Sequence, residues 1–170
     1  MNNAFSPGDP RWVTFEFVDA AWGMQSLELA WRFAAQDFRL CAAQSFLHAH
    51  EAQALHKGYN LDESALSLAS SDTSHGLWRD FQAWTINPLG MQGDLADQDL
   101  WGYSATSRDE GTDLGLVYVY DKAGTNPDGT IPPGPPPRRI AFLMVKEAAR
   151  WKVLNVNSLI VPQPGWPPTF

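Results

Sequence analysis

One carboxyl group in this sequence has a setting that would tune its chemistry. Asp19 lies among the aromatic residues Trp12, Phe15 and Trp22 at helical spacing. If this carboxyl points into a pocket, burial raises its pKa and makes it a usable acid or base. The alternative is a surface carboxylate on an amphipathic helix.

Two tyrosines offer hydroxyl groups that could assist such a carboxyl. Tyr103 and Tyr118 lie in neighbouring segments with the period of a β-strand. A phenol can donate a hydrogen bond to an enolate or carbonyl oxygen. The alternative is that both are core tyrosines with satisfied hydroxyl groups.

The histidines do not form a recognisable metal motif. His48, His50 and His56 lie in one helical stretch, and Glu51 follows His48 by three residues. A zinc pair on a helix needs ligands three or four residues apart and further ligands elsewhere. A solvated polar helix face is the alternative to a partial site at His48 and Glu51. Because the sequence also lacks a phosphate-binding Gly-rich loop and a nucleophile elbow, it predicts no metal and no cofactor.

Composition excludes several classes of partner. The net charge is −7, whereas nucleic-acid binders use Lys and Arg to neutralise phosphates, and anionic membranes are disfavoured for the same reason. An apolar content of 44% with eight tryptophans supplies a core. No apolar run approaches the ~20 residues of a membrane span. These features predict a soluble, cytoplasmic protein that binds neither nucleic acid nor membrane. The single cysteine, Cys41, lies in an apolar run and is predicted to be a buried hydrophobic residue.

The elements that would position these residues begin with helices. Pro10 suits the first turn of a helix capped by Asp9 or Ser6, and Ser26 can cap a second. Periodicity predicts helical segments at residues 10–22, from residue 27, from about 38 or 42 to 57, around 63–69, and over 78–86 before Pro88.

Strands follow the helices. Alternation predicts strands at residues 101–106 and 114–120, and residues 138–158 form a closing hairpin. We therefore predict an α+β fold in which a curved antiparallel sheet packs against N-terminal helices. One domain spans residues 1–170, with a core at about 10–160, a Pro-rich loop at 121–137 and a Pro-rich arm at 162–170.

The order of elements and four short segments resemble a known superfamily. A first helix ends in Trp22-Gly23, and the second begins with Ser26-Leu27-Glu28. Gln36-Asp37-Phe38-Arg39 follows, and the final strand opens with Arg150-Trp151-Lys152-Val153. This pattern resembles the nuclear transport factor 2-like superfamily, the cone-shaped α+β fold shared with ketosteroid isomerase, scytalone dehydratase and the SnoaL-like cyclases. Gln25-Ser26 departs from the Gly-Asp that is common there.

The resemblance implies a pocket between the concave sheet face and the helices, and pairing as a homodimer. Many small enzymes of the superfamily carry a pocket histidine on the final strand. The matching positions here are Asn155 and Asn157. Asparagine can orient a polar ligand, but it cannot accept a proton near neutral pH.

Three functional hypotheses follow. The first is a protein that binds a small molecule without obvious catalytic residues. The second is an enzyme of the isomerase, dehydratase or cyclase type that uses Asp19 and a tyrosine. The third is a structural or dimerisation module. For the first hypothesis, the pocket rim is predicted to comprise Trp101, Tyr103, Tyr118, Asn155 and Asn157, with Asp19 opposite.

Overall fold

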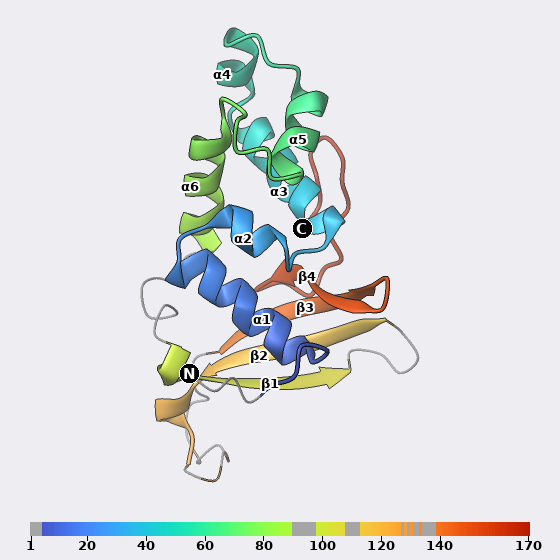
Figure 1. The fold of residues 1–170 in the computed structure, drawn as a ribbon. Coiled ribbons are helices and arrows are strands. Elements are labelled where there is room, and N and C mark those ends of the chain that lie inside the picture. Colours follow the sequence, from blue (N-terminus) through green and yellow to red (C-terminus); the bar gives the residue numbers. More distant parts are fainter. Residues whose placement is uncertain are drawn as a thin grey trace.

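The computed structural model describes residues 5–89, 98–107, 113–126, 128, 130, 133 and 139–170. In these residues, six α-helices precede a four-stranded antiparallel sheet, so the predicted α+β class is confirmed (Figure 1). The predicted loop at 121–137 lies partly outside the described residues. No helix in the described part of the chain is long and apolar enough to cross a membrane.

The helices come first along the chain. They are α1 (Pro10–Val18), continued by the π-helix η1 (Asp19–Gly23), then α2 (Leu27–Trp31), α3 (Gln36–Ala49), α4 (Glu51–His56), α5 (Leu61–Ala69) and α6 (Trp78–Leu89). After the 3₁₀ turn η3 (Gln98–Leu100) come the strands β1 (Trp101–Ser107), β2 (Leu114–Asp121), β3 (Arg139–Glu147) and β4 (Arg150–Val156), with the 3₁₀ turn η4 (Lys122–Gly124) after β2. The strands pair in chain order, and the sheet is open.

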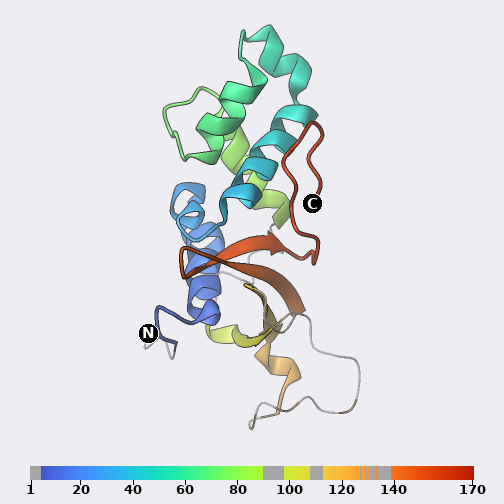
Figure 2. The same cartoon turned by 90° about the vertical axis from the view of Figure 1, so that its right-hand side faces the viewer.

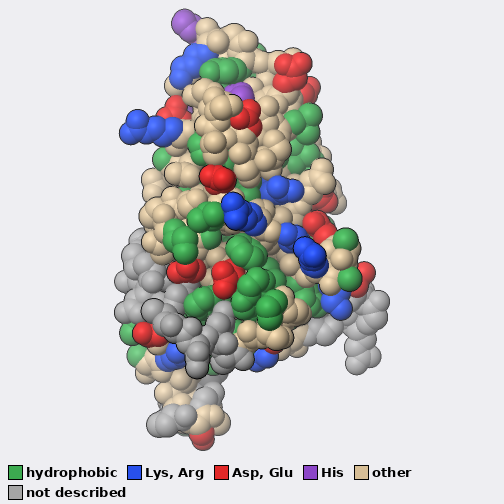
Figure 3. Space-filling view, viewed as in Figure 1, with side chains coloured by type: hydrophobic (Ala, Val, Ile, Leu, Met, Phe, Trp, Pro, Cys, Tyr) green, Lys and Arg blue, Asp and Glu red, His purple; other side chains and the backbone are tan. Residues whose placement is uncertain are grey.

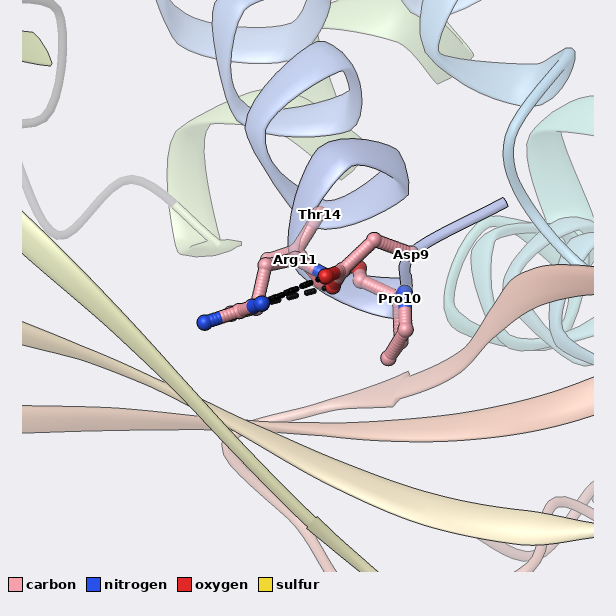
Figure 4. A network of polar contacts seen from close by, with 4 residues as sticks. All are labelled: Asp9, Pro10, Arg11 and Thr14. Carbon is pink, nitrogen blue, oxygen red and sulfur yellow. Dashed lines mark hydrogen bonds and ion pairs between the residues drawn. The ribbon is translucent and has the colours of Figure 1, made fainter. Parts of the chain in front are cut away.

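The start of α1 matches the sequence prediction. Asp9 is the N-cap, and its Oδ1 accepts a hydrogen bond of 2.8 Å from the backbone N–H of Arg11 (Figure 4). The Arg11 side chain returns to both oxygens of the same carboxylate. Pro10 occupies the first turn, where a missing N–H costs nothing. The helix therefore begins at a fixed point above the end of the sheet.

Helix α1 covers one face of the sheet, which we call the helix side. Phe17 packs against Phe142 of β3 with ring centroids 6.2 Å apart, and Phe15 lies 5.9 Å from Tyr103 of β1. Thr14 Oγ1 donates to the Pro10 carbonyl and lies 3.5 Å from Met144 Sδ. These three residues fall within the second half of α1, so that half of the helix is held against the sheet.

The remaining helices form a second layer beyond the β4 edge (Figures 1 and 2). The segment between α2 and α3 pairs with β4: Val153 N–H donates to the Phe33 carbonyl at 2.8 Å, and Ala35 N–H donates to the Val153 carbonyl at 2.8 Å. Trp31 and Phe38 then continue the apolar core from the sheet into the helices. One core thus runs through both layers.

The Pro-rich C-terminal arm lies along the helical layer (Figure 2). Gly165 N–H donates to Gln44 Oε1 of α3 at 3.0 Å, and Trp166 Nε1–H donates to Asp62 Oδ1 of α5 at 2.8 Å. The ring of Phe170 meets that of Phe38 edge-on. The arm therefore joins α3 to α5 on the outside of the layer.

Two helix boundaries differ from the sequence prediction. The long third helix is interrupted at His50, whose backbone leaves the helical region and whose Nδ1 lies 2.8 Å from the Phe46 carbonyl. The His50 N–H still donates to the same carbonyl at 3.1 Å, so the ring contact is added to the last helical hydrogen bonds of α3. Helix α6 also continues past Pro88 to Leu89.

The cap at Asp9 generates a pH-dependent prediction. Hydrogen bonds from Arg11 hold the pKa of the Asp9 carboxyl below its usual value. The charged form therefore stabilises the fold above the unfolded pKa, and this contribution is lost as pH falls through the lowered folded pKa. Asp9→Ala should lower the free energy of unfolding at neutral pH by about 1 kcal/mol.

Asp9→Asn separates the two parts of this contribution, because it keeps a capping oxygen and loses the charge. The stability gap between wild type and Asp9→Asn in urea unfolding should begin to narrow below about pH 4 and should close as pH falls through the lowered pKa of Asp9 in the folded protein. Asp80→Asn, in the first turn of α6, is the control. A gap that persists at low pH would contradict the role of the Asp9 charge.

The β3–β4 turn generates a second prediction. Ala148 and Ala149 both have positive φ, 48° and 64°, a conformation that costs an alanine roughly 1–2 kcal/mol. Asn-Gly is the preferred pair in such a turn. The double substitution Ala148→Asn and Ala149→Gly should raise the free energy of unfolding by about 1 kcal/mol. Ala123→Gly, at an exposed site without positive φ, should lower it; equal effects at both sites would refute the explanation.

Candidate functional site

A cleft of about 320 Å³ opens between the start of α1 and the end of the sheet. Its described lining comes from α1 and from all four strands, so it lies on the helix side, between helix and sheet. We call it the sheet-end cleft. It is lined by Pro10, Ala105, Thr106, Leu114, Gly115, Lys146 and Trp151.

The floor of the sheet-end cleft depends on a close approach between a glycine and an indole ring. A Cβ atom at Gly115 would lie 3.2 Å from Cη2 and 3.3 Å from Cζ3 of Trp151. Both distances are shorter than ordinary van der Waals contact. Because Gly115 has no side chain, the Trp151 ring can lie across β2 at this position.

Lys146 supplies the charge. It is directly opposite Trp151 in the β3–β4 pair, and its Nζ lies 5.0 Å from the centroid of the Trp151 ring. This is a cation–π distance. The Lys146 side chain is exposed, so the ammonium keeps donors for a ligand while the ring holds it at the cleft. Among the described lining residues, Lys146 is the only charged one.

The register divides the predicted pocket rim between the two faces of the sheet. Tyr103 is directly opposite Val119, whereas Tyr118 is directly opposite Ser104. Residues directly opposite share a face, and neighbours along a strand alternate. Trp101 and Tyr103 therefore lie on the helix side, and Tyr118 lies on the other face. There the Arg139 guanidinium lies 5.5 Å from the Tyr118 ring centroid.

The two asparagines have backbone partners in the segment after β4. Asn155 is buried; its Nδ2 donates to the Ile160 carbonyl at 2.8 Å, and its Oδ1 accepts from Val156 N–H at 2.8 Å. It lies opposite Leu143, on the same face as Tyr118. Asn157 is exposed, has a φ of 57°, and donates its N–H to the Ala141 carbonyl. Through these hydrogen bonds, both asparagines stabilise the chain where it leaves β4.

Asp19 lies at the start of η1, with its carboxylate beside Gly23: a Cβ at Gly23 would be 2.8 Å from Asp19 Oδ1. The second carboxyl near Asp19 is that of Glu16. Burial raises the pKa of the Glu16 carboxyl, and the charge of Asp19 raises it further. Neither residue belongs to the described lining of the sheet-end cleft. The rings that face Tyr103 are those of Phe5 and Phe15.

Two further hollows lie in the helical layer. One, of about 270 Å³, is bordered by His50 and Asp80, and the His50 ring stacks on Phe46 at 4.6 Å. The other, of about 380 Å³, brings His48 and Glu51 together with Asp62. In the described part of the chain, no group of three or more His, Cys, Asp or Glu side chains could hold a metal ion.

The residues that form the sheet-end cleft were not predicted as a site. In the sequence, Trp151 and Lys152 stand out only as the opening of the last strand. Gly115 within an apolar strand was the available signal, because such a glycine often marks a close approach. Lys146 gave no signal, since a charge near a hairpin end is ordinary.

Fold and cleft together define an α+β protein with an open cleft between a helix and an antiparallel sheet. Comparison of the chain with protein-family models, with curated proteins and with solved structures finds no match in any of the three. The geometry therefore carries the functional argument.

Cys41 is buried in α3, as predicted from its apolar neighbours. Burial, with a smaller contribution from the charge of Asp37, raises the pKa of the thiol to about 12. Only the thiolate reacts with disulfide reagents. We expect a thiol-specific chromogenic disulfide to leave the native protein unlabelled at about pH 8 and to label one thiol after denaturation. Rapid labelling of the native protein would contradict this burial.

Proposed function

We propose that this protein binds a small, partly apolar organic anion in the sheet-end cleft, and that its fold is of the nuclear transport factor 2-like type. The observation that carries the proposal is the pairing of the Lys146 ammonium with the Trp151 ring over Gly115. The ring offers a flat apolar surface and the ammonium offers a charge. A ligand with a flat body and one acidic group complements both.

The shape of the cleft supports a small ligand. Its volume of about 320 Å³ is at the lower end of the range for small-molecule sites, roughly 300–1,000 Å³. Pro10, Ala105 and the Trp151 ring give apolar walls, and Lys146 adds a single charge. Such sites are mostly apolar with a few placed polar groups.

Binding fits the cleft better than catalysis. Proton transfer needs a group that can gain or lose a proton near neutral pH, within hydrogen-bond reach of the substrate. The described lining contains no carboxyl or imidazole group. The carboxyls of Glu16 and Asp19 lie beyond it, so the isomerase or dehydratase alternative lacks a placed base in this cleft.

The test is titration with 1-naphthoate, a flat aromatic monoanion, followed by calorimetry and by the indole N–H signals in NMR spectra. We expect the Trp151 signal to shift on binding. Lys146→Met should weaken binding about tenfold or more, because hydrogen bonds to charged groups contribute roughly 1.5–3 kcal/mol. The neutral amide of the same acid should bind wild type and Lys146→Met equally.

Matched controls are available on the same chain. Trp166→Leu removes an exposed tryptophan of the C-terminal arm, and Lys57→Met removes an exposed lysine beyond α4. Neither should change the affinity for 1-naphthoate, whereas Trp151→Leu should weaken it. If Trp151→Leu and Trp166→Leu had the same effect, or the Trp151 signal did not move, the sheet-end cleft would not be the site.

A further inference from the structure

Basic side chains gather where α3 meets the β3–β4 hairpin, on the other side of the hairpin from the sheet-end cleft. Glu147 is directly opposite Arg150, and Lys152 lies two residues further along β4 on the same face. Arg39 is in the first turn and a half of α3. In the space-filling view, Lys and Arg side chains cluster around an acidic group in this region (Figure 3).

The positions of these groups are set by backbone contacts. The pairing of residues 33–35 with Val153 places the start of α3 beside β4. The Lys152 ammonium donates to the Arg32 carbonyl, and Gln36 N–H donates to Glu147 Oε1 at 3.3 Å. The cluster therefore belongs to a fixed junction of two elements and does not depend on freely moving side chains.

The positive charges in this cluster are not neutralised by direct ion pairs. Within the described residues, the ion pair closer than 4 Å joins Arg11 and Asp9, far along the chain from this junction. The Arg39 and Arg150 guanidinium groups repel the Lys152 ammonium. The Glu147 carboxylate attracts both the Arg39 guanidinium and the Lys152 ammonium. Three cations and one carboxylate leave a net charge of +2 at a protein whose total is −7.

One donor in the cluster has no partner. Arg39 Nε–H is buried and makes no hydrogen bond, although burial of such a donor is costly. Burial also lowers the pKa of the Arg39 guanidinium, and that of the Lys152 ammonium for the same primary reason. Arg39 as a whole is half-buried, and a half-buried guanidinium is stabilised by an oxyanion that supplies both charge and acceptors.

We propose that Arg39, Arg150 and Lys152 form a binding site for a phosphate dianion, either free phosphate or a phosphate monoester. The net charge of the cluster equals the opposite charge of the dianion, and two guanidinium groups offer the forked donors that phosphate oxygens accept. Glu147 is the internal counter-charge, and it opposes the entry of an anion.

The experiment is titration with inorganic phosphate at about pH 8, where phosphate is predominantly a dianion. Affinity is measured by calorimetry, and the Arg39 Nε–H signal is followed by NMR. Sodium chloride at equal ionic strength corrects for screening. We expect phosphate, and not chloride, to shift the Arg39 signal. Phenyl phosphate in a parallel titration distinguishes a monoester site from a site for the free ion, according to which binds more tightly.

The variants test each part of the cluster. Arg39→Met should weaken phosphate binding about tenfold or more, and Arg39→Lys, which keeps the charge and loses the fork, should weaken it less. Glu147→Gln should tighten binding about fivefold, because it removes a like charge near the anion. Because Glu147→Gln is expected to increase the affinity for phosphate, it tests the site even if the loss of Arg39 disturbs folding.

The control is Arg79→Met, which removes an exposed arginine of α6 away from the junction. It should leave phosphate affinity unchanged. The proposal is overturned if Arg79→Met and Arg39→Met weaken binding equally, if Glu147→Gln has no effect, or if phosphate leaves the Arg39 Nε–H signal in place. The 1-naphthoate titration reports on the other side of the hairpin, so the two sites can fail separately.

Discussion

The architecture depends on two backbone hydrogen bonds made by one residue. The N–H and the carbonyl of Val153 both pair with the segment between α2 and α3, which covers the edge of β4. Without this pairing, the sheet with α1 and the layer of α3 to α6 would meet only through side chains. The pairing also sets where α3 starts. It thereby brings Arg39 of the helical layer to Lys152 and Glu147 of the hairpin.

The two candidate sites lie on opposite faces of one hairpin. Lys146 and Trp151 face α1, and Glu147 and Arg150, the next pair, face the start of α3. This follows from the alternation of side chains in paired strands. Both sites use the β3–β4 hairpin. The sheet-end cleft is completed by α1, and the junction is completed by α3. Charge is therefore divided as well: one cation for the sheet-end cleft, three for the junction.

The elements of the fold could be predicted because they depend on local signals. Asp9 and Pro10 predict the start of α1, and Ser26 predicts that of α2. The site could not be predicted in the same way, because it depends on register. Whether Tyr103 and Tyr118 share a face is decided by which residues they oppose, and this pairing is fixed across a loop. The break at His50 likewise shows only in the backbone, which leaves the helical region at that residue.

The bulge in β4 has a consequence for insertions and deletions. Met144 opposes Val153 and Leu143 opposes Asn155, so Leu154 is an extra residue on its strand. Beyond it, the side-chain alternation of β4 is reversed relative to the first half. Removing Leu154 would restore the regular alternation, and Asn155 would stay opposite Leu143 on its present face, with Lys152 and Trp151 also in place. The bulge is therefore a point at which β4 can lose one residue while the pairs on both sides keep their register.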